Sequence, residues 1–184
     1  MKKSVQIGSN LFLIIMGLLF VILMALKRLP IPATSIEMSL QSLSIAILVI
    51  FLGKRAAGVI LIYLILASLG FPILAEGVTN SKWYLAPYAD YYFGFLISSL
   101  LLPRLLLLTK PQNYLQVWSR FSFNESSILF CGFLFLSLYF NPKEAWFIGV
   151  WPFLLGACLK ITVASFIYYL HVRLHKKSQN FVFT

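Results

Sequence analysis

The sequence predicts an all-α, polytopic membrane protein of about six transmembrane helices, with both termini cytoplasmic. Three observations support this prediction: an apolar composition, apolar runs of membrane-spanning length, and basic residues gathered between those runs. Of the 184 residues, 60% are hydrophobic and only 11% are charged. Soluble domains are about 25% charged, and a chain this short has too little polar surface to cover so much apolar material. The excess apolar side chains therefore face lipid, and we expect a single integral membrane domain over residues 1–184.

Six apolar segments approach the roughly 20 residues that a helix needs to cross about 30 Å of hydrocarbon. Pro30 and Pro32 break the chain after the first segment, and Gly53 separates the second from the third. The first segment ends in Lys27-Arg28 and not in a small-residue cleavage site, so we expect it to be retained as a helix. The predicted helices lie at about 9–26, 36–52, 56–74, 87–108, 125–140 and 145–170.

The positive charge of the chain indicates orientation in a membrane. The formal net charge is +10, from 15 Lys and Arg against 5 Asp and Glu. The basic residues occupy short loops, and most of them fall on one side when both termini are cytoplasmic. We therefore expect contact with anionic membrane lipids rather than with nucleic acid.

Lys160 is the clearest candidate for a functional residue, because it lies near the middle of the last predicted helix. A lysine at the bilayer centre costs about 2.5–3.5 kcal/mol on insertion scales. It should therefore face a cavity or a carboxylate. Gly156 lies one turn earlier and leaves space for a ligand or for a neighbouring helix. Two interpretations remain: contact with a ligand, or an ion pair with a protein acid such as Asp90.

A second group of candidates surrounds Asp90, in the first turn of the predicted fourth helix. The helix dipole favours an acid there, but a carboxylate can also accept hydrogen bonds from a ligand. Tyr88, Tyr91 and Phe95 share helical faces with Asp90, so they suit either an interfacial aromatic belt or the wall of a pocket. Gln41, near the start of the second helix, suits either a ligand contact or a helix–helix hydrogen bond.

The chain has none of the usual enzymatic constellations: no paired acids at helical spacing, no phosphate-binding glycine loop and no nucleophile elbow. His171 and His175 lie four residues apart but suit a solvated basic helix end better than a metal site. We therefore expect no enzyme activity, no metal and no cofactor.

Several short motifs follow one another along the chain in the order and spacing of one family. They are Pro30-Ile31-Pro32, Ser39–Ser42, Leu52–Arg55, Leu69–Pro72, Ala86–Phe95 and Trp151–Lys160. With these motifs the chain resembles, over nearly its whole length, the BioY family: the biotin-specific substrate-binding (S) component of energy-coupling-factor (ECF) vitamin transporters.

The resemblance implies the fold of an S component and capture of biotin from the outer side of a bacterial inner (plasma) membrane. On this basis we expect Asp90 and Gln41 to supply polar contacts to the ring system of biotin, Lys160 to pair with its valerate carboxylate, and the first loop to act as a lid. Partners would be a transmembrane coupling subunit and ATPase subunits, although a solitary carrier remains possible. The implied substrate-binding residues are Lys160, Asp90, Gln41, Tyr91, Tyr88, Gly156 and Phe95, with Pro30 and Pro32 in the lid loop.

Two departures from the family pattern bear on the ligand. The acid of the last motif is replaced by Ala157, and the Gly-Gly before Tyr91 is Ala89-Asp90. One hypothesis is that Asp90 replaces the missing acid; the alternative is a different vitamin. A membrane enzyme acting on lipid-linked substrates and a structural scaffold are the remaining rivals.

Overall fold

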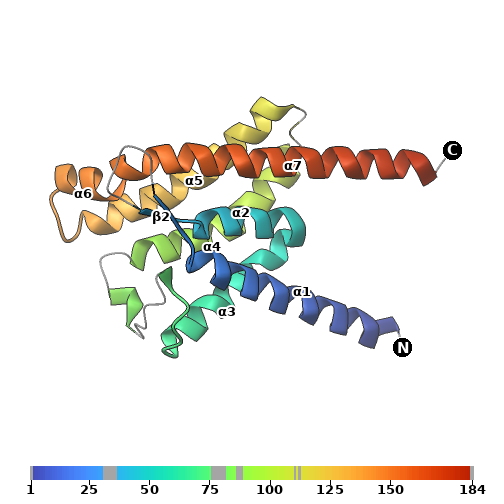
Figure 1. Ribbon diagram of the computed structural model, residues 1–184, viewed down its shortest axis with the longest axis horizontal. Coiled ribbons are helices and arrows are strands. Elements are labelled where there is room, and N and C mark those ends of the chain that lie inside the picture. The colour runs from blue at the N-terminus through green and yellow to red at the C-terminus, as the bar shows by residue number, and fades with distance from the viewer. Residues whose placement is uncertain are drawn as a thin grey trace.

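The computed structural model is a bundle of α-helices with one short pair of strands (Figure 1). It describes residues 2–30, 37–75, 82–85, 89–109, 111 and 113–182, without the side chains of 2–9, 37–38, 89–90 and 175–182. The helices are α1 (Lys2–Ala25), α2 (Gln41–Leu52), α3 (Ala56–Ser68), α4 (Ala89–Thr109), α5 (Tyr114–Leu136), α6 (Pro142–Gly149) and α7 (Leu154–Val182). Short 3-10 turns are η1 (Gly53–Arg55), η3 (Trp83–Leu85) and η4 (Trp151–Phe153), and the strands are β1 (Arg28–Pro30) and β2 (Glu37–Ser39).

Within the described residues, three helical stretches are long and apolar enough to cross a membrane: Gln41–Ser68, Tyr91–Thr109 and Pro142–Leu174. The first of them contains the turn at Gly53, and Asn10–Ala25 forms a shorter apolar helix. Large apolar side chains point outward along the bundle, such as Leu108, which is 83% exposed, and Leu115, which is 73% exposed. Such a surface suits lipid and not water, which agrees with the predicted all-α membrane fold.

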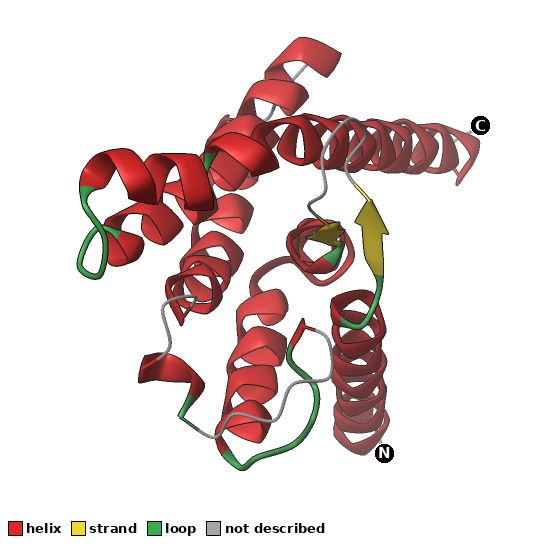
Figure 2. Ribbon diagram, turned by 60° about the vertical axis from the view of Figure 1, so that its left-hand side comes forward, coloured by secondary structure: helices red, strands yellow, loops and turns green. Residues whose placement is uncertain are grey.

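The first residues of α1 and the last residues of α7 lie at the same end of the bundle (Figure 1). The strand pair follows the other end of α1, and Figure 2 shows it beside the start of α2. The two strands pair antiparallel, with Arg28 opposite Ser39 and Pro30 opposite Glu37. Both termini therefore leave the bundle at one end, as two cytoplasmic termini would require.

The C-terminal half differs from the predicted helix boundaries in two places. The fifth helix begins at Tyr114, and not near Glu125, because the side chain of Asn113 accepts a hydrogen bond from the Gln116 N–H at 2.9 Å and caps it. The predicted helix over 145–170 is two helices, because η4, which contains Pro152, separates α6 from α7.

Helix α5 packs mainly against α4 and α7. Gly94 allows α4 to approach α5 closely, because an added Cβ would lie 3.2 Å from the Cα of Ile128. Phe121 and Ile128 of α5 are each 2% exposed and belong to the same apolar core as Tyr63 of α3. The extended α5 thus carries Glu125 into the buried interior of the bundle.

Gly70 terminates α3 with φ at +92°, in the left-handed region that disfavours a side chain. No atom lies within 4 Å of a Cβ built there, so Gly70→Ala is a test of backbone strain alone. We expect it to destabilise the fold by about 1–2 kcal/mol. Gly58→Ala, inside α3 and equally free of neighbours, should stabilise it by about 0.5–1 kcal/mol. Thermal unfolding in detergent measures both, and shifts of the same sign would contradict the prediction.

Candidate functional site

A cavity of about 420 Å³ lies among the strand pair, α2, α4, α5 and α7. Its size falls in the range of small-molecule sites, which are mostly apolar with a few polar groups that orient the ligand. The polar and charged wall residues are Arg28, Ser39, Gln41, Ser42, Glu125 and Lys160. The remaining wall is made of Leu74, Ala75, Tyr91, Tyr92, Phe95, Ile128, Leu129 and Phe153.

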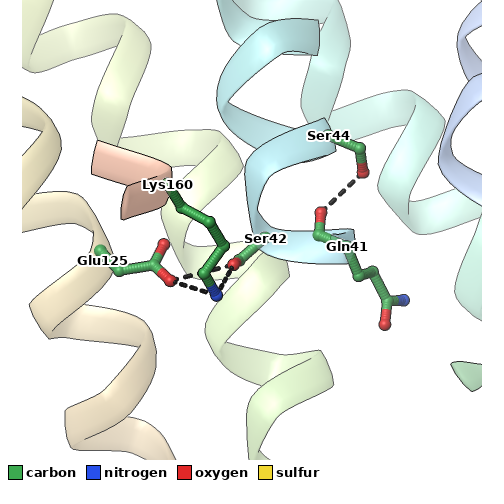
Figure 3. Close-up of polar contacts among 5 residues, drawn as sticks. All are labelled: Gln41, Ser42, Ser44, Glu125 and Lys160. Atoms are coloured by element: carbon green, nitrogen blue, oxygen red, sulfur yellow. Dashed lines mark hydrogen bonds and ion pairs between the residues drawn. The ribbon is translucent and has the colours of Figure 1, made fainter. Parts of the chain in front are cut away.

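Three of the polar wall residues form a closed ring of contacts (Figure 3). The Nζ of Lys160 lies 2.8 Å from Oε1 of Glu125 and donates to the Oγ of Ser42 at 2.6 Å. The Ser42 hydroxyl in turn donates to the same Oε1 of Glu125 at 2.9 Å. Each atom acts in a role that its chemistry allows, since the ammonium only donates and the carboxylate only accepts.

The ring is buried and joins three helices. The side chains of Lys160 and Glu125 are only 12% and 7% exposed, and they come from α7 and α5. Ser42 comes from the first turn of α2 and is 4% exposed. A buried charge is tolerated when an opposite charge and hydrogen bonds compensate the loss of hydration. Lys160 has therefore both features that its position predicted, a carboxylate and a cavity.

Glu125 is positioned by the register of α5. Its neighbour Asn124 is 2% exposed and faces α4, where its Oδ1 accepts a hydrogen bond from Ser98 at 2.7 Å. Successive helical residues point about 100° apart, as 3.6 residues make one turn. With Asn124 turned to α4, Glu125 faces α2 and α7, from which Ser42 and Lys160 approach.

Gln41 forms a second buried polar link beside the ring. Its Nε2 donates to the hydroxyl of Tyr63 at 2.8 Å, and that hydroxyl donates to the carbonyl oxygen of Ile73 at 2.8 Å. Gln41 thus makes the helix–helix hydrogen bond that was one of its two predicted roles, and it also lines the cavity. The sequence alone did not indicate Tyr63 as its partner.

The aromatic wall is held by contacts of its own. The Tyr91 hydroxyl donates to the backbone carbonyl of Gly149, and its ring meets Phe153 edge to face at 6.2 Å. Tyr92 packs edge to face on Phe95 at 5.7 Å and on Trp83 at 5.4 Å. These contacts fix the rings on the cavity wall and give it a defined shape.

The structure brings four of the predicted site residues to one cavity: Lys160, Gln41, Tyr91 and Phe95. They come from α7, α2 and α4, so distant parts of the chain converge there. Gly156 is buried one turn before Lys160 on α7 and is not part of the cavity wall described above.

The other predicted residues lie at or beyond the limits of the described structure. Tyr88 and Pro32 fall outside the described residues, and Asp90 is described only as backbone in the first turn of α4. Pro30 is exposed at the end of β1. The strand pair itself was not predicted, and two of its residues that face each other, Arg28 and Ser39, both line the cavity.

Glu125 is the functional residue that sequence reasoning missed. The sequence predicts a helix that starts at Glu125 and suggests Asp90 as the acid that pairs with Lys160. The helix start is wrong, because Glu125 lies inside α5, and the acid that pairs with Lys160 is Glu125. The polar residues between Tyr114 and Glu125 resemble a loop in hydropathy. The one sequence feature that pointed to an earlier helix start was Asn113, a favoured N-cap residue.

Comparisons with known proteins agree with this geometry. A model of the BioY family matches residues 1–177. A protein of Rickettsia prowazekii (strain Madrid E) described as a probable biotin transporter BioY is 23% identical over 158 residues, which cover 84% of this chain and 79% of that protein. The crystal structure of an S-component for biotin from an ECF-type ABC transporter matches with a TM-score of 0.76 and 23% identity, over 93% of both chains. At this identity the structural match establishes the fold.

The buried ion pair makes a prediction for stability. Lys160→Met leaves the carboxylate of Glu125 without its cation, and breaking a buried pair in this way costs about 3–5 kcal/mol. The double variant Lys160→Met/Glu125→Gln removes both charges and should recover most of that loss. The exposed neighbours Lys143 and Glu144 offer matched controls, and Lys143→Met and Glu144→Gln should change stability by less than about 0.5 kcal/mol. Unfolding in detergent measures all four, and a double variant as unstable as Lys160→Met would contradict the prediction.

Proposed function

The chain belongs to the BioY family, and on that premise we propose that it captures biotin at the outer face of a bacterial plasma membrane for import by an ECF transporter. The relative from Rickettsia prowazekii is described as a probable biotin transporter, and the solved S-component is one for biotin. The observation in this chain that carries the proposal is a buried charged pair at the wall of a 420 Å³ cavity inside an apolar bundle. Ionisable groups at such depth mark substrate sites by default, because they are costly to bury.

The cavity suits the chemistry of biotin. Biotin has a compact bicyclic head with a polar ureido group and a flexible chain that ends in a carboxylate. The aromatic and aliphatic wall, including Tyr91 and Phe95, suits the carbon and sulfur atoms of the head, and Gln41 and Lys160 supply polar contacts. The proposed substrate-binding residues are Lys160, Asp90, Gln41, Tyr91, Tyr88 and Phe95, with Pro30 and Pro32 in the lid loop. Gly156, which is buried behind the cavity wall, is proposed only to leave space beside Lys160.

Transport then requires energy from other chains. We propose that a transmembrane coupling subunit and ATPase subunits supply it, as the S-component assignment implies. The small residues of α1 point inward: Ala25 is 0% exposed, and a Cβ on Gly17 would lie 3.1 Å from Leu48 and from Leu52. The outward face of α1 is bulky, with Phe12 62% and Leu23 60% exposed, so a partner on this helix would meet large side chains.

Uptake of radiolabelled biotin tests the function directly. Cells that express the chain with a coupling module should accumulate biotin above cells with the module alone, and unlabelled biotin should abolish the uptake. Riboflavin, thiamine and pantothenate at the same excess should not compete, because the polar groups of the cavity match a ureido ring. Competition by one of these three instead of biotin would support the other-vitamin alternative. Expression without the module separates a solitary carrier from an S component.

Asp90 requires a test of its own, since it was proposed as an acceptor for the ring N–H groups of biotin. Asp90→Asn keeps the shape of the side chain and removes its charge, so it should weaken biotin binding by roughly tenfold if the carboxylate accepts a ligand hydrogen bond. Titration calorimetry on purified protein measures the Kd. Glu144→Gln, in the exposed first turn of α6, is a control for the removal of one negative charge. An unchanged Kd for Asp90→Asn removes Asp90 from the site.

A further inference from the structure

We infer that Tyr63 is a positioning residue that makes Gln41 select a ligand which donates a hydrogen bond. The hydroxyl of Tyr63 holds the side-chain amide of Gln41 in one orientation, in which the amide nitrogen is occupied and the amide oxygen is left for the ligand. Tyr63 itself does not line the described cavity. The inference rests on the proposed capture of biotin, whose ureido ring carries two N–H donors, and it adds a residue that acts on the ligand only through another.

The direction of the hydrogen bonds at Tyr63 follows from the groups that take part. A backbone carbonyl can only accept, so the single proton of the Tyr63 hydroxyl is donated to the carbonyl oxygen of Ile73, at 2.8 Å. The same hydroxyl then has only lone pairs to offer Gln41, whose Nε2 lies 2.8 Å away and donates to it. The amide oxygen of Gln41 accepts no hydrogen bond from a described residue, and it remains as the acceptor of this side chain.

Burial keeps the amide in this orientation, because water has little access to replace a lost partner. Tyr63 is 1% exposed and Gln41 is 2% exposed. If the amide turned over, its oxygen would face the hydroxyl oxygen of Tyr63, and no proton would lie between the two acceptors. If the hydroxyl then turned toward Gln41, the carbonyl of Ile73 would lose its bond to Tyr63. Either change leaves a buried polar group unpaired, which is unfavourable.

The hydroxyl of Tyr63 also connects two parts of the cavity wall. Ile73 is followed directly by Leu74 and Ala75, which line the cavity, as does Gln41 of α2. Helix α3, which carries Tyr63, contributes none of the described wall residues. This helix therefore acts on the cavity from outside, through one side chain. A change of Tyr63 alters no direct contact between the described wall and a ligand.

The acceptor of Gln41 defines what a ligand has to supply at this point of the wall. In Figure 3 the amide of Gln41 points away from Ser42 and Lys160, so it is separate from the ring of contacts around the ion pair. An amide oxygen suits a ligand N–H and disfavours a ligand oxygen. A buried site built to pair an N–H rejects an analogue that lacks it, because the protein acceptor is then left unpaired. Gln41, held by Tyr63, should therefore distinguish a ureido N–H from a ring oxygen of similar size.

Two cyclic carbamate analogues of biotin provide the probe. In each of them a ring oxygen replaces one of the two ureido N–H groups, while the rest of the molecule is retained. For purified full-length wild type, at least one carbamate should have a Kd roughly 10- to 100-fold above that of biotin. Gln41→Ala identifies the carbamate that lacks the N–H at Gln41, because its Kd relative to that of biotin should fall when the acceptor is removed.

Tyr63→Phe tests the positioning itself. It keeps the ring and removes the hydroxyl, so the amide of Gln41 can turn and donate from Nε2 to the ring oxygen of that carbamate. The Kd of that carbamate relative to biotin should fall roughly tenfold, and the ratio for the other carbamate should stay at its wild-type value. A purely structural role would raise all three Kd values by a common factor and leave both ratios unchanged. Tyr139→Phe removes the hydroxyl of a tyrosine that is 52% exposed, and as a matched control it should retain wild-type Kd values.

A measurement on the wild type keeps the inference testable if Tyr63→Phe does not fold. In protein with isotope-labelled glutamine, the side-chain signals of Gln41 are those that disappear in Gln41→Ala. Addition of biotin should shift the resonance of its amide carbon, whose oxygen accepts from the ligand. The Nε2 signals should change little, because Tyr63 and not the ligand contacts that nitrogen. A large shift at Nε2 with an unchanged carbon resonance overturns the inference.

The remaining outcomes separate the inference from the proposed function. Unfolding temperatures in detergent verify that each variant is folded. Unchanged ratios in folded Tyr63→Phe overturn the inference and leave biotin capture intact. The same conclusion follows if wild type binds biotin and both carbamates equally, or if Gln41→Ala changes neither ratio. A wild-type chain that does not bind biotin overturns both.

Discussion

The ion pair between Lys160 and Glu125 is the interaction on which the rest of the site depends. It connects α7 to α5, and through Ser42 it includes α2. In a membrane, helices gain little from hydrophobic association because lipid is as apolar as their side chains, so polar contacts and close packing define how they meet. The charge on α5 and the charge on α7 compensate each other when these two helices meet, and the hydroxyl of Ser42 on α2 adds a hydrogen bond to each. The same contact therefore fixes the helices and forms the polar part of the cavity wall.

The polar groups of α5 show how one helix organises its neighbours. Asn124 binds Ser98 of α4, and the next residue, Glu125, binds α2 and α7. Each polar side chain has a partner on a different helix, while Phe121 and Ile128 on the same helix are buried in the apolar core. The packing of α5 between α4 and α7 agrees with this distribution, since each of the two polar residues faces a neighbouring helix.

The sequence predicted well what depends on hydropathy and on the cost of buried charge. The apolar helices, a cavity or a carboxylate at Lys160, and four wall residues on three helices were accessible from composition and spacing alone. Prediction from the sequence failed for polar residues whose hydrogen-bond or ion-pair partners are distant in the chain. Glu125 and the polar turns before it have the hydropathy of a loop. Hydropathy is a local property, so it does not reveal that Ser42 and Lys160, which are distant in the sequence, compensate the charge of Glu125. The strand pair escaped notice for a similar reason, because a pairing of only three residues on each side leaves no periodic pattern.

The arrangement of the ends connects the site to its proposed task. The outer residues of α1 and α7 lie at one end of the bundle, whereas the strand pair follows the opposite end of α1 (Figure 1). Arg28 and Ser39 of that pair line the cavity, so the cavity borders the end remote from the termini. If the termini are cytoplasmic, as the distribution of basic residues predicts, the strand pair lies toward the outer face. The part of the cavity wall that the strand pair forms then lies on the side from which a ligand would arrive.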